Sequence, residues 1–153
     1  MKRPSCGGTA AGRYVPRVPT LTRWFLRAAI VNLVAGLALG LTLAVPSLAD
    51  RAAPWHAAWI HLLVMGWATQ MIFGVAYWMF PRKKPLDLRA TDWLGWTCFV
   101  ALNLGLLLRA ISEPAVATGA SGLAPTGLLL AAALQFAAVT AFVIQIWPRV
   151  TTR

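Results

Sequence analysis

Four long apolar stretches constrain the fold of this chain more than any other feature. They cover approximately residues 24–45, 57–80, 93–111 and 123–147. Each is close to the roughly 20 residues that an α-helix needs to cross about 30 Å of hydrocarbon. Only 12% of the residues are charged, whereas a soluble domain carries about 25%. The sequence therefore predicts an all-α integral membrane protein, a bundle of four transmembrane helices with the lipid bilayer as its solvent.

Proline and tryptophan mark the ends of the predicted helices. Proline interrupts helices because it lacks an N–H group, and indole rings favour the membrane–water interface. The prolines in the gaps are Pro46, Pro54, Pro81, Pro85, Pro114 and Pro125. The tryptophans near expected interfaces are Trp24, Trp55, Trp59, Trp78, Trp93, Trp96 and Trp147. Seven of the eight tryptophans lie at such positions, which a soluble core would not explain.

The positions of Lys and Arg predict the orientation in the membrane, because cytoplasmic loops carry an excess of both. Twelve of the 14 basic residues fall on one side, and only Arg51 and Arg109 fall on the other. We expect both termini in the cytoplasm and the protein in the cell's inner (plasma) membrane. Residues 1–22 read as a basic disordered cytoplasmic tail, and residues 23–149 as the four-helix transmembrane domain. The net charge of +10 comes from these short blocks, which argues against a nucleic-acid partner.

A cleaved signal peptide is an alternative interpretation of the first apolar stretch. Ser47-Leu48-Ala49 resembles a small-residue cleavage site, and cleavage would leave three helices. The basic region before the stretch is too long for a signal peptide, and the stretch itself is long for its apolar core, so we favour a retained helix. The two cysteines, Cys6 and Cys98, provide neither a disulfide framework nor a metal motif.

His61 is the strongest candidate for a functional residue. It lies about seven residues from the centre of the second helix, so roughly 11 Å from the bilayer midplane at 1.5 Å per residue. An ionisable residue at this depth is a functional hypothesis by default, and histidine is a common haem ligand. Gly66 and Gly74 thin the same helix and would admit a porphyrin or a neighbouring helix. The alternative is a neutral histidine hydrogen-bonded across helices.

Arg109 is expected at a depth similar to that of His61, near the end of the third helix. One interpretation is an arginine that reaches the interface and pairs with Glu113. The other is a guanidinium that binds a haem propionate. His56, by contrast, reads as an interfacial, solvated histidine. It lies five residues before His61, so the two cannot bind opposite faces of one haem, and a shared metal ion would want a spacing of three or four.

Each predicted helix carries one amide side chain near its centre: Asn32, Gln70, Asn103 and Gln135. Amides are costly in lipid unless they pair, so we expect an interhelical polar layer. A quinone or proton path could use the same residues. The four acidic residues are expected in loops or at helix ends, and no phosphate loop, HExxH motif or pair of catalytic carboxylates is present. We therefore expect no hydrolytic or transferase chemistry and assign no catalytic residue.

The second predicted helix resembles that of haem–copper oxidase subunit I, particularly cbb-type cytochrome c oxidases and the nitric oxide reductase large subunit. The likeness lies in a run that opens with His61 and closes with Gly74, Tyr77-Trp78 and Pro81. The run Asn103-Leu-Gly-Leu-Leu-Leu-Arg109-Ala-Ile-Ser-Glu113-Pro114 is similar to short membrane proteins grouped with that subunit. Roughly residues 22–147 are covered, and the first and fourth helices match only in hydrophobicity.

The resemblance implies that His61 ligates a low-spin haem, expected as haem b, on the outer side of the membrane. A complete oxidase needs about six histidines and this chain has two, so a copper site is not expected. The leading hypothesis is a haem-binding membrane protein of respiratory electron transport, a homodimer or part of a larger membrane subunit. A cofactor-free structural or assembly subunit is the alternative, and a transporter is disfavoured because broken helices are not evident.

Overall fold

The computed structural model describes residues 18–80 and 88–151, with side chains described from Trp93 onward in the second part. It contains four helices long and apolar enough to cross a membrane: Thr20–Ala44, Pro46–Met79, Trp93–Ala117 and Leu123–Thr151. The described residues contain no strand. The predicted all-α, four-helix membrane bundle is therefore confirmed. The expected basic tail up to Arg17 and the basic loop Arg82–Lys84 lie outside the described residues.

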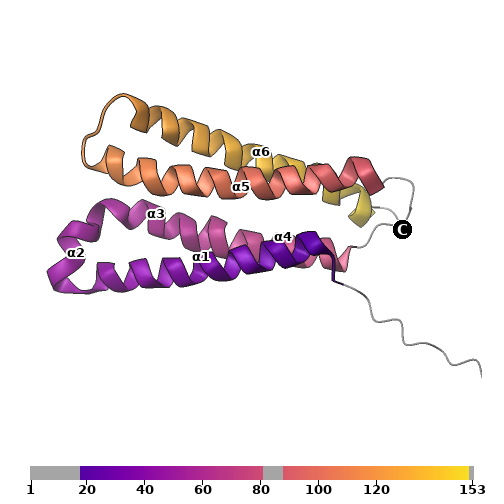
Figure 1. Cartoon of the computed structure of the whole chain (residues 1–153), viewed down its shortest axis with the longest axis horizontal. Coiled ribbons are helices and arrows are strands. Elements are labelled where there is room, and N and C mark those ends of the chain that lie inside the picture. Colours follow the sequence, from indigo (N-terminus) through magenta and orange to yellow (C-terminus); the bar gives the residue numbers. More distant parts are fainter. Residues whose placement is uncertain (1–17, 81–87, 152–153) are drawn as a thin grey trace, which may run out of the picture.

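The bundle consists of two helical hairpins that pack side by side (Figure 1). In the first hairpin, α1 (Thr20–Ala44) is followed by α2 (Pro46–Ala52), the 3₁₀ turn η1 (Ala53–Trp55), α3 (His56–His61), the π-helical segment η2 (Leu62–Thr69) and α4 (Gln70–Met79). In the second hairpin, α5 (Leu88–Ala117) turns into α6 (Leu123–Thr151). The start of α1 and the end of α6 lie at the same end of the bundle (Figure 1). We call the opposite end, where α5 turns into α6, the turn end.

The helices extend further than the proline positions predicted. Residues 46–52 form α2 rather than a loop, because Pro46 occupies the first helical turn, where its missing N–H costs nothing. Pro114 was expected to follow the third helix, yet it lies inside α5, which continues to Ala117. Pro148 likewise lies within the last turn of α6. A proline near a helix end removes one backbone hydrogen bond without displacing a long following segment, so these prolines do not end their helices.

Aromatic side chains form much of the contact between the hairpins. Phe73 on α4 stacks on Phe142 of α6 with ring centroids 3.7 Å apart. Phe25 of α1 is fully buried and meets Phe99 of α5 edge-on at 5.1 Å. Edge-to-face pairs such as Phe25–Phe99 are each worth about 0.5–1.5 kcal/mol beyond the area they bury. They hold the two hairpins in one register, which positions the polar residues between them.

The two glycines of the second span bring α1 close. A Cβ atom at Gly66 would lie 2.8 Å from the Cβ of Asn32, and one at Gly74 would lie 3.1 Å from the Cβ of Phe25. Real Cβ contacts are rarely this short, so glycine is needed at both positions for the backbones to approach. Of the two occupants considered for these glycines, the structure therefore shows a neighbouring helix and leaves no space for a porphyrin there.

The π-helical segment η2 changes which side chains of the second span face the same way. In a regular α-helix, nine residues of separation place His61 and Gln70 about 180° apart. A π-helix has wider turns, closed by i→i+5 hydrogen bonds, and therefore rotates by a smaller angle per residue. The hydroxyl of Thr69 follows this spacing and donates to the carbonyl of Val64, five residues earlier, at 2.9 Å. As a result, His61 and Gln70 both contact α5.

Candidate functional site

The second span makes polar contacts with the second hairpin at three levels. Near the turn end, His61 contacts Glu113 of α5. In the middle, Gln70 and Asn103 of α5 exchange two hydrogen bonds, of 3.1 and 3.3 Å. Toward the other end, the hydroxyl of Tyr77 donates to Oε1 of Gln145 on α6 at 2.6 Å. Because each level joins the two hairpins, these contacts fix their register as well as satisfying polar groups in an apolar medium.

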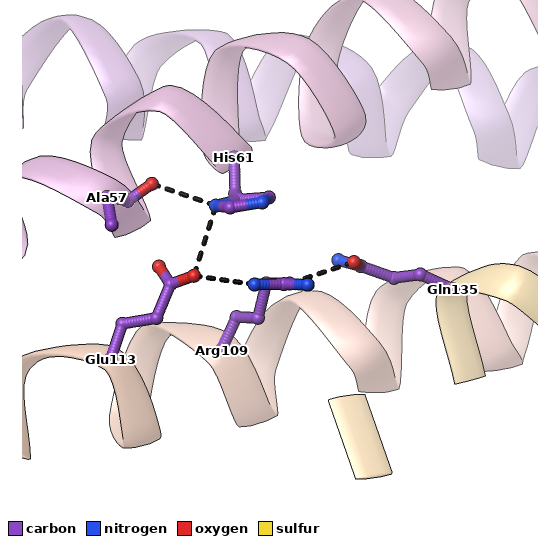
Figure 2. Close-up of polar contacts among 5 residues, drawn as sticks. All are labelled: Ala57, His61, Arg109, Glu113 and Gln135. Carbon is purple, nitrogen blue, oxygen red and sulfur yellow. Dashed lines mark hydrogen bonds and ion pairs between the residues drawn. The ribbon is translucent and has the colours of Figure 1, made fainter. Parts of the chain in front are cut away.

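The level nearest the turn end holds four polar side chains from three helices, drawn in Figure 2. Nδ1 of His61 lies 3.1 Å from Oε1 of Glu113. The same carboxylate oxygen accepts a hydrogen bond of 2.7 Å from Nη1 of Arg109, one turn earlier on α5. Nε of Arg109 donates to Oε1 of Gln135 on α6 at 2.9 Å. We call these four residues the His–Glu cluster.

Glu113 lies near the end of a helix, as expected for the acidic residues, but it is buried there. It lies within α5 and is only 7% exposed. Its burial is tolerated because Arg109 neutralises the carboxylate at hydrogen-bonding distance, and buried charges need such partners. The i,i+4 spacing of Arg109 and Glu113 was a usable signal, and their predicted pairing is confirmed. The contact of Glu113 with His61 was missed, because the third helix was expected to end at residue 111.

The geometry around His61 determines how its ring can act. Nδ1 lies 2.9 Å from the carbonyl oxygen of Ala57 as well as 3.1 Å from Glu113. Both neighbours are acceptors, so Nδ1 carries the proton and donates in the neutral ring. In that tautomer Nε2 has the lone pair, and the contacts that His61 makes within residues 18–80 and 93–151 are through Nδ1. The side chain is 29% exposed. His61 is thus bonded across helices through one nitrogen and free to accept or ligate through the other.

Two buried atoms of the His–Glu cluster have no hydrogen-bond partner among the described residues: Oε2 of Glu113 and Nε2 of Gln135. One is an acceptor and the other a donor. Leaving such a group unsatisfied costs about 1–3 kcal/mol. The cluster therefore has the capacity to bind additional polar groups of either kind.

The four predicted amides do not form a single layer. Gln70 and Asn103 pair with each other. Gln135 instead accepts from Arg109, and Asn32 donates to the carbonyl of Ala28 in its own helix at 2.9 Å. Only Gln70 and Asn103 thus form an amide–amide pair between helices, while Gln135 binds Arg109 and Asn32 binds its own helix. Tyr77 and Gln145 form the third interhelical contact, which the sequence interpretation did not identify.

His56 is separate from the cluster. Its side chain is exposed, and its ring meets Trp59 edge-on at 5.5 Å. This fits the interfacial histidine expected from the sequence. Within the part of the chain that the structure describes, no group of three or more His, Cys, Asp or Glu could hold a metal ion.

Comparison with known proteins identifies no relative. No protein-family model matches the sequence, and neither a curated protein nor a solved structure matches the chain. The likeness to subunit I of haem–copper oxidases consequently stays a prediction from the residues that carry it.

Proposed function

We propose that this protein binds haem b through His61 in the cell's inner (plasma) membrane and serves respiratory electron transfer. The observation that carries the proposal is the pair of acceptors within 3.1 Å of Nδ1 of His61. Histidine ligands of metals usually donate their second ring N–H to a carboxylate or a backbone carbonyl, and Nδ1 of His61 has both kinds of acceptor within 3.1 Å. Nε2 is left with the lone pair that would ligate iron.

The rest of the His–Glu cluster offers hydrogen-bond donors to a haem propionate, but some of these donors are already engaged. The unpartnered Nε2 of Gln135 could donate to a propionate beside Arg109, which keeps Arg109 as the candidate propionate partner. Two nitrogens of the Arg109 guanidinium are already engaged by Glu113 and Gln135, so a propionate could use only the remaining N–H groups. When bound, the haem would supply one-electron redox chemistry. The residues of the chain would orient His61, neutralise the propionate and exclude water.

The distribution of Lys and Arg predicts which side of the membrane the His–Glu cluster faces. With both termini in the cytoplasm, the turn end and the His–Glu cluster lie toward the outer face of the membrane. Fusions of a reporter active only in the periplasm should be inactive at the C-terminus and active when inserted at Gly119, in the α5–α6 turn. The opposite pattern would reverse the topology.

Haem binding is tested by expressing the full chain with ample haem, purifying it in mild detergent and recording a reduced-minus-oxidised visible spectrum. We expect the α-band of b-type haem in the wild type and in His56→Ala, the matched histidine control. His61→Ala should lose the band while retaining its helical circular dichroism. A colourless wild type, or an equal band in His61→Ala, would refute the proposal.

A second candidate is a cofactor-free structural or assembly subunit. It is favoured by the observation that His61 and Arg109 already find partners inside the chain, at 3.1 and 2.7 Å from the same oxygen of Glu113. On this view the His–Glu cluster only fixes the hairpins. The same spectrum decides between the two, since this candidate requires a colourless protein whose stability falls in His61→Ala.

A further inference from the structure

A haem bound through His61 would have one ligand from this chain, and the helices that the structure describes offer no second one across the iron. Histidine and methionine are the usual axial ligands of electron-transfer haems. Apart from Met1, every His and Met of the sequence lies between His56 and Met79, on the same span as His61. The helices α5 and α6, which pack against this span, contain neither. No neighbouring helix can therefore present a His or Met across an iron bound to His61.

Other side chains with a suitable donor atom are also out of reach. His56 lies on the same stretch, one turn earlier, and packs on Trp59. Cys98 is fully buried in the core cluster with Tyr77, and Tyr77 contacts Gln145 at the level farthest from the His–Glu cluster. Within the part of the chain that the structure describes, the ligand set is thus incomplete.

A second copy of the chain satisfies the geometric condition that an axial pair imposes. The two ligating nitrogens must lie at the same membrane depth on opposite faces of the haem. A two-fold axis along the membrane normal brings identical residues to the same depth without any further adjustment. An unrelated subunit would need a histidine placed independently at roughly 11 Å from the midplane, which nothing in this chain would enforce.

The surface beside His61 is compatible with such contact. Ile60, Val64 and Trp67 are 44%, 52% and 38% exposed, and Ala57 is exposed one turn before His61. These residues flank a ring that is itself 29% exposed. In lipid, helices associate through van der Waals packing, most closely at small residues such as Ala57. A symmetric contact here would cover the haem edges with apolar side chains.

We infer that two copies of this chain bind one haem on a two-fold axis, with Nε2 of His61 from each copy as the two axial ligands. The inference rests on the proposed haem function and adds the partner and the stoichiometry. It requires one haem for two chains, six-coordinate low-spin iron and a dimer that depends on haem.

The test measures haem by pyridine haemochrome, chain mass by light scattering with detergent correction, and spin state by low-temperature electron paramagnetic resonance. We expect one haem per dimer, a bis-histidine low-spin signal, and monomers when haem is withheld. Co-expression of differently tagged wild-type and His61→Ala chains, followed by two-step affinity purification, provides the second arm. The mixed dimer should lose the low-spin signal and bind carbon monoxide, whereas a mixture with His56→Ala should behave as wild type.

Val64→Trp tests the contact surface without altering a ligand, and it should lower the dimer fraction and the low-spin signal together. One haem per chain, or a monomer with five-coordinate haem, would overturn the dimer while leaving haem binding through His61 intact. Low-spin haem in a complex of one copy with a different protein would do the same. Failure of the wild type to bind any haem would overturn the proposed function and this inference with it.

Discussion

Removing the Glu113 carboxylate should show how strongly the His–Glu cluster depends on charge pairing. In Glu113→Leu, the guanidinium of Arg109 would keep its hydrogen bond to Gln135 but lose the carboxylate that lies 2.7 Å from it in the wild type. The Arg109 side chain is 18% exposed and that of Glu113 only 6%, so solvent can replace little of what is lost. Breaking a buried ion pair by removing one partner costs about 3–5 kcal/mol. Because Arg109 retains Gln135 and some exposure, we expect the lower value, about 3 kcal/mol.

The double variant Arg109→Leu/Glu113→Leu separates charge pairing from packing. Replacing a whole buried ion pair by apolar residues is often neutral or stabilising, so the double variant should be more stable than Glu113→Leu alone. The assay is reversible unfolding in mixed micelles, with thermal midpoints as a second measure. A loss of about 3 kcal/mol corresponds to roughly 6–12 °C for a chain of this size. A loss below about 1 kcal/mol in Glu113→Leu, or additive losses in the double variant, would refute the reasoning.

Three further predictions concern the contacts between helices. Gln70→Leu or Asn103→Leu alone should lower the free energy of unfolding by about 1 kcal/mol, because each leaves one amide unpaired in lipid. The double variant should lower it by less than the sum of the two single losses. A double-mutant cycle on the unfolding free energy checks this. Gly105→Ala should destabilise by about 1–3 kcal/mol through overpacking, because its Cβ would lie 2.9 Å from Cγ of Gln135 and 3.1 Å from the Ala131 carbonyl oxygen. Val143→Ala, at a lipid-facing position, is the control and should change the thermal unfolding midpoint little. Equal midpoints for Gly105→Ala and Val143→Ala would contradict the close approach of α5 and α6. Deleting Val64 should restore a regular α-helix, in which the remaining eight-residue separation places His61 about 80° from Gln70, so that cysteines at 61 and 113 should cross-link less while those at 70 and 103 still do.

The number and type of helices could be predicted from the sequence because lipid imposes a length and a composition on each span. Helix ends were predicted less well, since proline was taken as a terminator. In α5 the consequence was functional: Pro114 stays in the helix, so Glu113 becomes a buried residue rather than a loop residue. A periodicity argument cannot anticipate this, because proline in the last turn of a helix costs little.

In the candidate site, the contact within one helix could be predicted from the sequence, whereas the contacts between helices could not. The pairing of Arg109 with Glu113 follows from i,i+4 spacing within one helix. The contact of His61 with Glu113 depends on the relative rotation of two helices, which η2 sets through its wider turns. Nothing in the hydrophobic pattern of Leu62–Thr69 distinguishes a π-helix from an α-helix. For the same reason the four amides were predicted to meet in one layer, whereas only Gln70 and Asn103 meet.

The three-level polar contact between the hairpins has a consequence for biosynthesis. Chains enter the membrane from the N-terminus, so the span that carries His61, Gln70 and Tyr77 is synthesised before Glu113, Asn103 and Gln145 exist. Until the second hairpin emerges, these three side chains must be held by the insertion machinery or by water at the membrane surface, because bare lipid offers no hydrogen bonds. Assembly of the hairpins is then the step at which an insertase or chaperone can act, and it is complete only once Gln145, the last of these residues to be synthesised, has entered the membrane.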